Sequence, residues 1–253
     1  MTKILRQTSE TPEEFFVKYD GNFERHKILS SWSEERSENF KKTIIENIVA
    51  VGVPEKEAVE NYAELCDVFA AWMLGKTTDY DPGTFKRLQF GSISPNKGFY
   101  IMGKKGTGKT TFMCAFRNAV RKYVKQFDYQ GFRKVTGFDI KNEFASYGVR
   151  KTGYDGFEGG LEKYFKPFHN ETGREFEVLY VDDFLFEGEG EGTSYYGNTT
   201  KVTEDVIKAR MDNGLLTFIT SNFAPDSFSE PVVDRIKESM NVIFISSNES
   251  FRK

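Results

Sequence analysis

The chain has 253 residues, a net charge of −3 at neutral pH and an aromatic content of 15%, with 25 phenylalanines. This is enough for one large α/β domain plus a smaller element. The charge excludes a globally basic nucleic-acid binder, so any contact with DNA or RNA requires a local patch. Residues 1–14 have no apolar core typical of a signal peptide, and no apolar run approaches membrane-spanning length. A cytoplasmic protein is therefore expected.

The cysteine content indicates a reducing compartment. Cys66 and Cys114 lie far apart, each inside an apolar pattern with helical spacing. They are interpreted as buried thiols rather than a disulfide. With only two histidines in the chain, a zinc site is not expected.

Residues 1–80 are predicted to form a small helical unit with three amphipathic helices, which begin at the capping patterns near Thr11 and Ser31 and at Pro54. Each helix carries apolar residues three and four positions apart: Phe15, Phe16 and Tyr19; Phe40, Ile44, Ile45, Ile48 and Val49; and Val59, Tyr62, Ala63, Cys66, Phe69, Ala70 and Met73. These apolar faces allow two interpretations. They pack on each other or on the rest of the chain, or they dock a partner protein. The linker after them is predicted at residues 77–83.

A glycine-rich phosphate-binding loop follows the linker. Residues 103–110 read G-x-x-x-x-G-K-T, directly after an apolar strand at 98–102 and before an apolar pattern with helical spacing. This order turns backbone N–H groups and a helix N-terminus toward a polyphosphate, and these flanks disfavour a chance match. Lys109 is predicted to reach the β- and γ-phosphates and Thr110 to bind Mg²⁺. The predicted nucleotide-binding residues are Gly103, Gly106, Thr107, Gly108, Lys109, Thr110 and Thr111.

The middle of the chain contains a predicted strand at 133–138, a helix that begins at Asp139, and a segment at 150–174 rich in glycine, aromatic and basic residues. Aromatic side chains can stack on bases while basic ones contact phosphates, so this segment is a candidate for binding single-stranded nucleic acid. An amphipathic surface helix with buried rings is the alternative. The candidate residues are Arg150, Lys151, Tyr154, Phe157, Lys163, Tyr164, Phe165, Lys166 and Phe168.

A second catalytic element follows at residues 178–183, where an apolar strand ends in two acids. Asp182 is predicted to hold Mg²⁺ through its water shell beside the phosphate-binding loop, and Asp183 to orient the attacking water. The alternative is a buried strand that ends in an acidic loop. The glycine- and glutamate-rich residues at 184–198 are predicted to form a solvated connection.

The last elements are a helix at 201–211, a strand at 215–222, a helix at 231–236 and a strand at 241–245. Asn222 ends its strand in a Thr-Ser-Asn triplet and is predicted to contact the γ-phosphate and the attacking water; a turn capped by asparagine is the alternative. Arg235 is predicted to stabilise charge on a γ-phosphate bound by a neighbouring subunit. Its alternative is a surface arginine paired with a nearby acid, Asp234 or Glu238.

In this order, the motifs G-x-x-G-x-G-K-T, V-L-Y-V-D-D, T-F-I-T-S-N and D-R-I before a final strand resemble an AAA+ ATPase, and within that class the DnaC/IstB-like group of helicase loaders and transposition ATPases. The resemblance covers about residues 85–253. It implies an α/β fold with a five-stranded parallel sheet in the order 5-1-4-3-2, flanked by helices. It also implies ATP and Mg²⁺, Asn222 as sensor 1, Arg235 as a finger acting in trans, and an ATPase modulated by single-stranded DNA.

The chain departs from this family in one catalytic residue and shares one absence with the loaders. Most ATPases of this type carry glutamate where Asp183 stands, and the shorter side chain predicts slow hydrolysis. Few residues follow the last strand, so no C-terminal helical lid is expected, as in loaders of this group. The missing lid contact predicts modest nucleotide affinity.

The resulting functional hypothesis is an ATPase that loads or remodels a replicative DNA helicase, with residues 1–80 docking the helicase and residues 85–253 forming an ATPase domain that assembles side by side. An IstB-like transposition ATPase that binds DNA and recruits a transposase is the alternative, although the charge of −3 argues mildly against coating duplex DNA. A metabolite kinase is disfavoured by the acid pair and the Thr-Ser-Asn triplet. A nucleotide-binding adaptor without turnover stays open because of Asp183.

Overall fold

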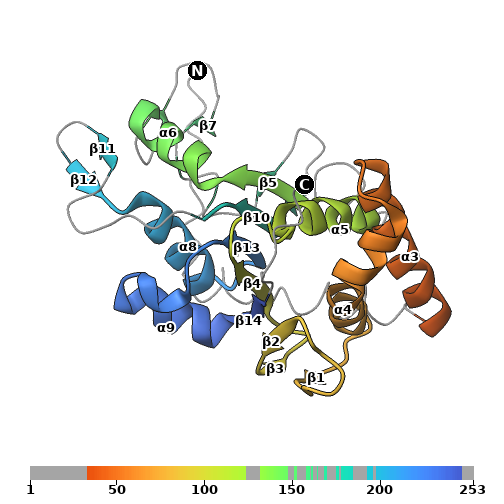
Figure 1. Cartoon of the computed structure of the whole chain (residues 1–253). Helices are drawn as coiled ribbons and strands as arrows, with labels where there is room; N and C mark the ends of the chain where they lie inside the picture. The colour runs from red at the N-terminus through yellow and green to blue at the C-terminus, as the bar shows by residue number, and fades with distance from the viewer. Residues whose placement is uncertain are drawn as a thin grey trace, which may run out of the picture.

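The computed structural model describes residues 33–123, 132–147, 178–184 and 201–246, together with short segments between residues 151 and 200. Its centre is a sheet of six strands with helices on both faces (Figure 1). The sheet strands are β2 (Leu88–Phe90), β4 (Gly98–Gly103), β5 (Phe132–Thr136), β10 (Val178–Asp182), β13 (Thr217–Ser221) and β14 (Met240–Ile245). None of the helices in these described parts is long and apolar enough to cross a bilayer.

The parallel part of the sheet has the predicted strand order. The strands β14, β4, β13, β10 and β5 are parallel neighbours in that sequence, which is 5-1-4-3-2 when they are numbered along the chain. The prediction of five strands was incomplete, because β2 adds an antiparallel sixth strand beside β14. This short strand covers an edge that would otherwise expose unpaired backbone groups.

The central strands explain the apolar runs in the sequence. β10 and β13 are buried at every position, as expected for parallel strands covered on both faces. β4 begins at Gly98, where an added Cβ would lie only 1.9 Å from the carbonyl oxygen of Thr217. A glycine at this position therefore permits the close approach of β4 and β13.

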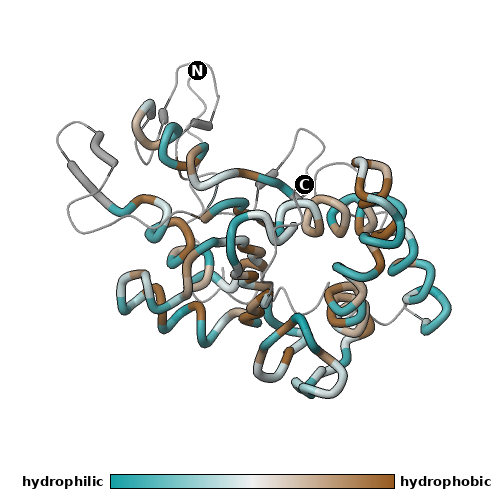
Figure 2. The backbone as a smooth tube through the Cα atoms, in the orientation of Figure 1, coloured by the Kyte–Doolittle hydropathy of each residue, from teal (hydrophilic) through white to brown (hydrophobic). Residues whose placement is uncertain are grey.

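The helices divide into two groups, one on each face of the sheet. On one side lie α3 (Glu34–Ala50), α4 (Glu55–Met73) and α5 (Lys109–Tyr123), and on the other α6 (Gly137–Tyr147), α8 (Val202–Asp212) and α9 (Glu230–Ser239). Figure 2 shows apolar residues gathered in the strands at the centre. The other short elements are β1 (Thr78–Asp79), β3 (Ser92–Ile93), β6 (Lys151–Thr152), β7 (Glu158–Gly159), β8 (Phe168–His169), β9 (Glu175–Phe176), β11 (Thr193–Tyr195), β12 (Asn198–Thr200) and the 3₁₀ turn η2 (Pro225–Ser227).

Helices α3 and α4 share one hydrophobic cluster with the sheet rather than forming a core of their own. Phe69 of α4 stacks on Phe99 of β4 with ring centroids 4.1 Å apart, and Phe40 of α3 meets Phe116 of α5 edge to face at 5.9 Å. For residues 33–73, the structure therefore matches the interpretation in which the helical faces pack on the rest of the chain. The helix predicted near Thr11 lies outside the described residues.

The chain between α4 and β4 is anchored at several points. The predicted linker contains β1, which pairs antiparallel with β3. Behind it, the Glu64 carboxylate on α4 accepts hydrogen bonds from the backbone N–H groups of Lys86, Arg87 and Leu88. These bonds fix the start of β2 against α4.

Candidate nucleotide-binding site

The loop after β4 has the backbone that a phosphate-binding loop requires. Gly106 and Gly108 have φ angles of 88° and 75°, a region that side chains other than glycine rarely adopt. At Gly108 an added Cβ would also lie 2.1 Å from the Tyr62 hydroxyl oxygen. The loop leads directly into α5, which begins at Lys109. The free N–H groups of this helix end and its dipole favour an anion.

The Lys109 ammonium group lies buried at the mouth of this loop. Its Nζ donates to the carbonyl oxygens of Gly103 at 2.7 Å and Lys104 at 3.0 Å, and to Asn222 Oδ1 at 3.0 Å. These carbonyl and amide oxygens hold the ammonium at the mouth of the loop, where a phosphate group can make a stronger, charge-assisted hydrogen bond with it.

Asp182, at the end of β10, is a buried carboxylate that accepts several hydrogen bonds. Its Oδ1 accepts from the hydroxyls of Tyr180 at 2.6 Å, Thr220 at 2.7 Å and Thr110 at 2.8 Å, and its Oδ2 lies 2.9 Å from Lys134 Nζ. Burial by itself would raise the pKa of Asp182, but these four donors together lower it below its ordinary value. Asp182 is therefore ionised at neutral pH.

The donor set at this point fits a magnesium ion that accompanies a polyphosphate. The Thr110 hydroxyl and the Asp182 carboxylate meet beside the loop, and oxygen atoms are the ligands that Mg²⁺ prefers. In the described ranges, no group of three or more His, Cys, Asp or Glu side chains could hold a metal. Two protein oxygens suit Mg²⁺, which usually keeps waters and takes substrate phosphates as further ligands.

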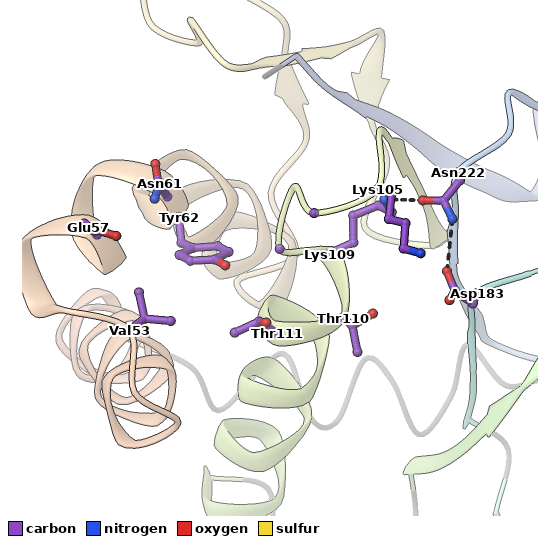
Figure 3. A pocket seen from close by; sticks show the side chains of 12 residues that line it. Val53, Glu57, Asn61, Tyr62, Lys105, Lys109, Thr110, Thr111, Asp183 and Asn222 are labelled. Atoms are coloured by element: carbon purple, nitrogen blue, oxygen red, sulfur yellow. Dashed lines mark hydrogen bonds between the residues drawn. The ribbon is translucent and has the colours of Figure 1, made fainter. Parts of the chain in front are cut away.

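Asp183 and Asn222 complete the polar side of the site (Figure 3). Asp183 has a φ of 52°, which aspartate tolerates better than most residues, and its N–H donates to Thr220 Oγ1 at 3.2 Å. Asn222 Nδ2 donates to Asp183 Oδ1 at 3.3 Å, while Asn222 Oδ1 accepts from Lys109. The amide of Asn222 therefore links the loop lysine to the second acid. Its contact with a γ-phosphate and the attacking water remains a prediction.

A cavity of about 200 Å³ connects these groups to helix α4 (Figure 3). One wall comes from the segment before α4 and its first turns, and the other from the loop and the ends of β10 and β13. The lining residues are Val53, Glu57, Asn61, Tyr62, Lys105, Gly106, Gly108, Lys109, Thr110, Thr111, Asp183 and Asn222. The wall on α4 was not predicted, because only the packing of α4 against α5 brings it to the loop.

Arg235 lies apart from this cavity. It is on α9, where its guanidinium donates to Asp212 Oδ1 at 2.6 Å and to Glu238 Oε2 at 2.8 Å. The pairing with Glu238 matches the alternative of a surface arginine, and Asp212 is an additional partner. A role in the site of a second copy remains a prediction.

The segment proposed for single-stranded nucleic acid is described only in short pieces. Tyr164 is only 2% exposed, and the Arg133 guanidinium lies 5.0 Å from the centre of its ring. Tyr164 is therefore a core residue and cannot stack on a base, which matches the alternative of buried rings. The side chains of the other residues in this candidate set lie outside the described parts.

No protein-family model matches the chain, but it is similar to solved structures of the class that its motifs resemble. The DnaC helicase loader has 17% identity and a TM-score of 0.43, covering 74% of this chain and 91% of that chain. The replication initiator DnaA bound to AMPPCP and single-stranded DNA has 17% sequence identity and a TM-score of 0.44, and the match covers 76% of this chain and 49% of that chain. DnaI has 21% identity and a TM-score of 0.37, and the match covers 62% of this chain and 73% of that chain. These TM-scores are below 0.5, and what this chain binds is therefore inferred from its own residues.

Proposed function

We propose that this protein binds ATP with Mg²⁺ in the loop at 103–110 and hydrolyses it. The observation that carries the proposal is the convergence of Lys109, Asp182, Asp183 and Asn222 at one edge of the sheet. These residues come from the start of α5 and the ends of β10 and β13, far apart in the sequence. Ligands of α/β sheets typically bind at the carboxyl ends of the strands, and each residue type here has a role in phosphoryl transfer.

The geometry suggests how each group acts. The loop N–H groups and Lys109 bind the phosphates, with phosphate oxygens replacing the carbonyl oxygens that now accept from Lys109 Nζ. Thr110 and Asp182 are the residues that would hold Mg²⁺, which would neutralise charge that develops on the phosphates. Asp183 orients the attacking water as its general base, and Asn222 positions Asp183 and contacts the γ-phosphate.

The cavity has room beside the phosphate-binding loop for the nucleoside end of the ligand. From the loop it extends toward Val53 and Tyr62, whose apolar surfaces suit a base. Asn61 lines the same wall, and its Oδ1 accepts a hydrogen bond from the Arg87 guanidinium. With the oxygen engaged, the amide NH₂ of Asn61 is the group left to donate to the nucleoside.

Asn61→Ala is expected to weaken ATP binding by roughly tenfold, about the value of one hydrogen bond in a partly buried site. The affinity for tripolyphosphate, which uses only the loop, should not change. Isothermal titration calorimetry with both ligands checks this. Asn47→Ala, which removes an amide on α3 that donates to the Ala115 carbonyl of α5 and does not line the cavity, is the matched control. Equal effects on both ligands, or none, would contradict the nucleoside position.

We propose that the ATPase acts on a replicative DNA helicase, with single-stranded DNA as its other partner; the IstB-like transposition role is the alternative. The order of the four sequence motifs supports this role. Native mass spectrometry with the replicative helicase of the same organism tests it, with and without ATP. Deleting residues 1–32 is the suitable variant, because α3 and α4 are part of the shared core. ATP-dependent assembly on DNA without a helicase complex would favour the transposition role.

Arg235→Ala is expected to abolish hydrolysis if Arg235 serves the site of a neighbouring copy, with a loss of about 10³-fold or more. Mixing it with Lys109→Ala should restore activity, because a mixed interface pairs an intact loop with an intact arginine. Phosphate release across mixing ratios measures this. Lys237→Ala, on the same helix and paired with Asp226, is the control. Loss of activity without rescue would assign Arg235 a structural role with Asp212 and Glu238.

A further inference from the structure

Lys134 places a permanent positive charge beside the carboxylate proposed to hold magnesium. In the parallel pair of β5 and β10, Lys134 lies opposite Tyr180 and Thr136 lies opposite Asp182, so the long lysine side chain extends along the pair to the acid. Its Nζ is 2.9 Å from Asp182 Oδ2. The same ammonium lies 3.5 Å from Cys114 Sγ and 5.7 Å from the centre of the Tyr180 ring.

The two oxygens of Asp182 are held by different kinds of donor. Oδ1 accepts from three neutral hydroxyls, including that of Thr110 in the phosphate-binding loop. Oδ2 faces the charged Lys134. Because the hydroxyls already fix the position of the carboxylate, the main effect of Lys134 on Asp182 is its positive charge. The Asp182 side chain is only 8% exposed, so water weakly screens the interaction between the two charges.

We propose that Lys134 is a built-in counter-ion that weakens the affinity of the Asp182 site for a divalent cation, so that the metal binds only together with the phosphates. This proposal rests on the proposed nucleotide function and concerns the regulation of the same site. Without ligand, Lys134 balances the negative charge of Asp182, which leaves little net attraction for a free cation. The phosphates of a bound nucleotide supply the missing negative charge.

Lys134 also affects the release of products after hydrolysis. Once the γ-phosphate has left, the site has lost negative charge, and Lys134 again offsets Asp182. Release of the metal with the remaining nucleotide is then easier than it would be from an unbalanced carboxylate. Lys134 acts only through the charge of Asp182 and is therefore not itself a catalytic residue.

The test is the gain in ADP affinity that magnesium produces. Calorimetric dissociation constants for ADP are measured in EDTA and in excess Mg²⁺, and their ratio reports how strongly the site favours the metal. Lys134→Met, which keeps the length of the side chain but not its charge, should raise this ratio roughly tenfold, and in EDTA it should bind ADP no more tightly than the unmodified protein does. Lys134→Gln, which can still donate to Asp182, should raise it in the same direction.

The controls separate charge from structure. Lys134→Arg keeps the charge and should keep the ratio of the unmodified protein. Lys208→Met removes an exposed lysine–aspartate pair on α8 and should also keep the ratio. If both neutral variants bind ADP in EDTA but show an unchanged or smaller ratio, the proposed role of Lys134 is wrong, while the nucleotide site itself is not affected. No ADP binding by the unmodified protein in either buffer would overturn the nucleotide site itself.

Discussion

Lys109→Ala is expected to bind ATP at least about 100-fold more weakly than the unmodified protein, because it removes charge-assisted hydrogen bonds to the phosphates worth about 1.5–3 kcal/mol each. The ammonium is buried, and the carbonyl and amide oxygens of Gly103 and Asn222 that accept from it are weaker partners than a charged phosphate. Calorimetry with ATP and Mg²⁺ measures the loss.

Lys104→Ala is the matched control, since Lys104 belongs to the same loop but its side chain is exposed and does not line the cavity. It should bind ATP almost normally. Thermal melting of both variants without nucleotide shows whether the fold survives. A folded Lys109→Ala protein with unchanged ATP affinity would contradict the assignment of the loop at 103–110 as the phosphate-binding site.

Asp183→Asn is expected to leave ATP binding intact and to slow turnover by about 10²–10⁴-fold, the usual contribution of a general base. Asparagine removes the carboxylate with the least change to the backbone, because it tolerates the positive φ of this position, whereas alanine would add backbone strain. Steady-state phosphate release, together with ATP affinity, measures the two effects separately.

Asp226→Asn is the control for this change, because Asp226 is an exposed acid that pairs with Lys237 away from the cavity. Its turnover should equal that of the unmodified protein. If Asp183→Asn hydrolyses ATP at the normal rate, another group must orient the attacking water. The nucleotide-binding adaptor would instead be favoured if the unmodified protein bound ATP without measurable turnover.

The residues that sequence could locate are those whose role is tied to a local pattern. The loop needs its glycines, Lys109 and Thr110 in immediate succession. Asp182 ends one apolar strand and Asn222 directly follows another. Because carboxyl ends of parallel strands meet at one edge, these patterns sufficed to predict that the groups converge. The strand order followed from the family resemblance and is confirmed by the pairing of the strands.

The parts that sequence could not locate depend on tertiary packing or on register. Asn61 and Tyr62 were visible only as members of a helix, because their approach to the loop comes from the seating of α4 on α5. Lys134 meets Asp182 only through the register of β5 against β10, which no local pattern specifies. The edge strand β2 is three residues long, too short to show a strand periodicity.

Residues 33–73 illustrate why domain boundaries are harder to predict than elements. The amphipathic patterns gave the right helices, with α3 beginning after Ser33, whose side chain accepts from the Arg36 N–H at 3.1 Å. They could not show what the apolar faces contact, since packing on a neighbouring sheet and docking a partner require the same pattern. The aromatic contacts of Phe40 and Phe69 with the rest of the core decide between these for α3 and α4.

The measurement that tests the central claim most directly is a single-turnover experiment with γ-labelled ATP, Mg²⁺ and an excess of protein, in which bound nucleotide and free phosphate are quantified in the same samples. We expect that ATP binds and is slowly converted to ADP and free phosphate with no added acceptor. Lys109→Ala should lack both steps and Asp183→Asn only the second. No bound nucleotide, or phosphate release that persists in both variants, would contradict the assignment of this site.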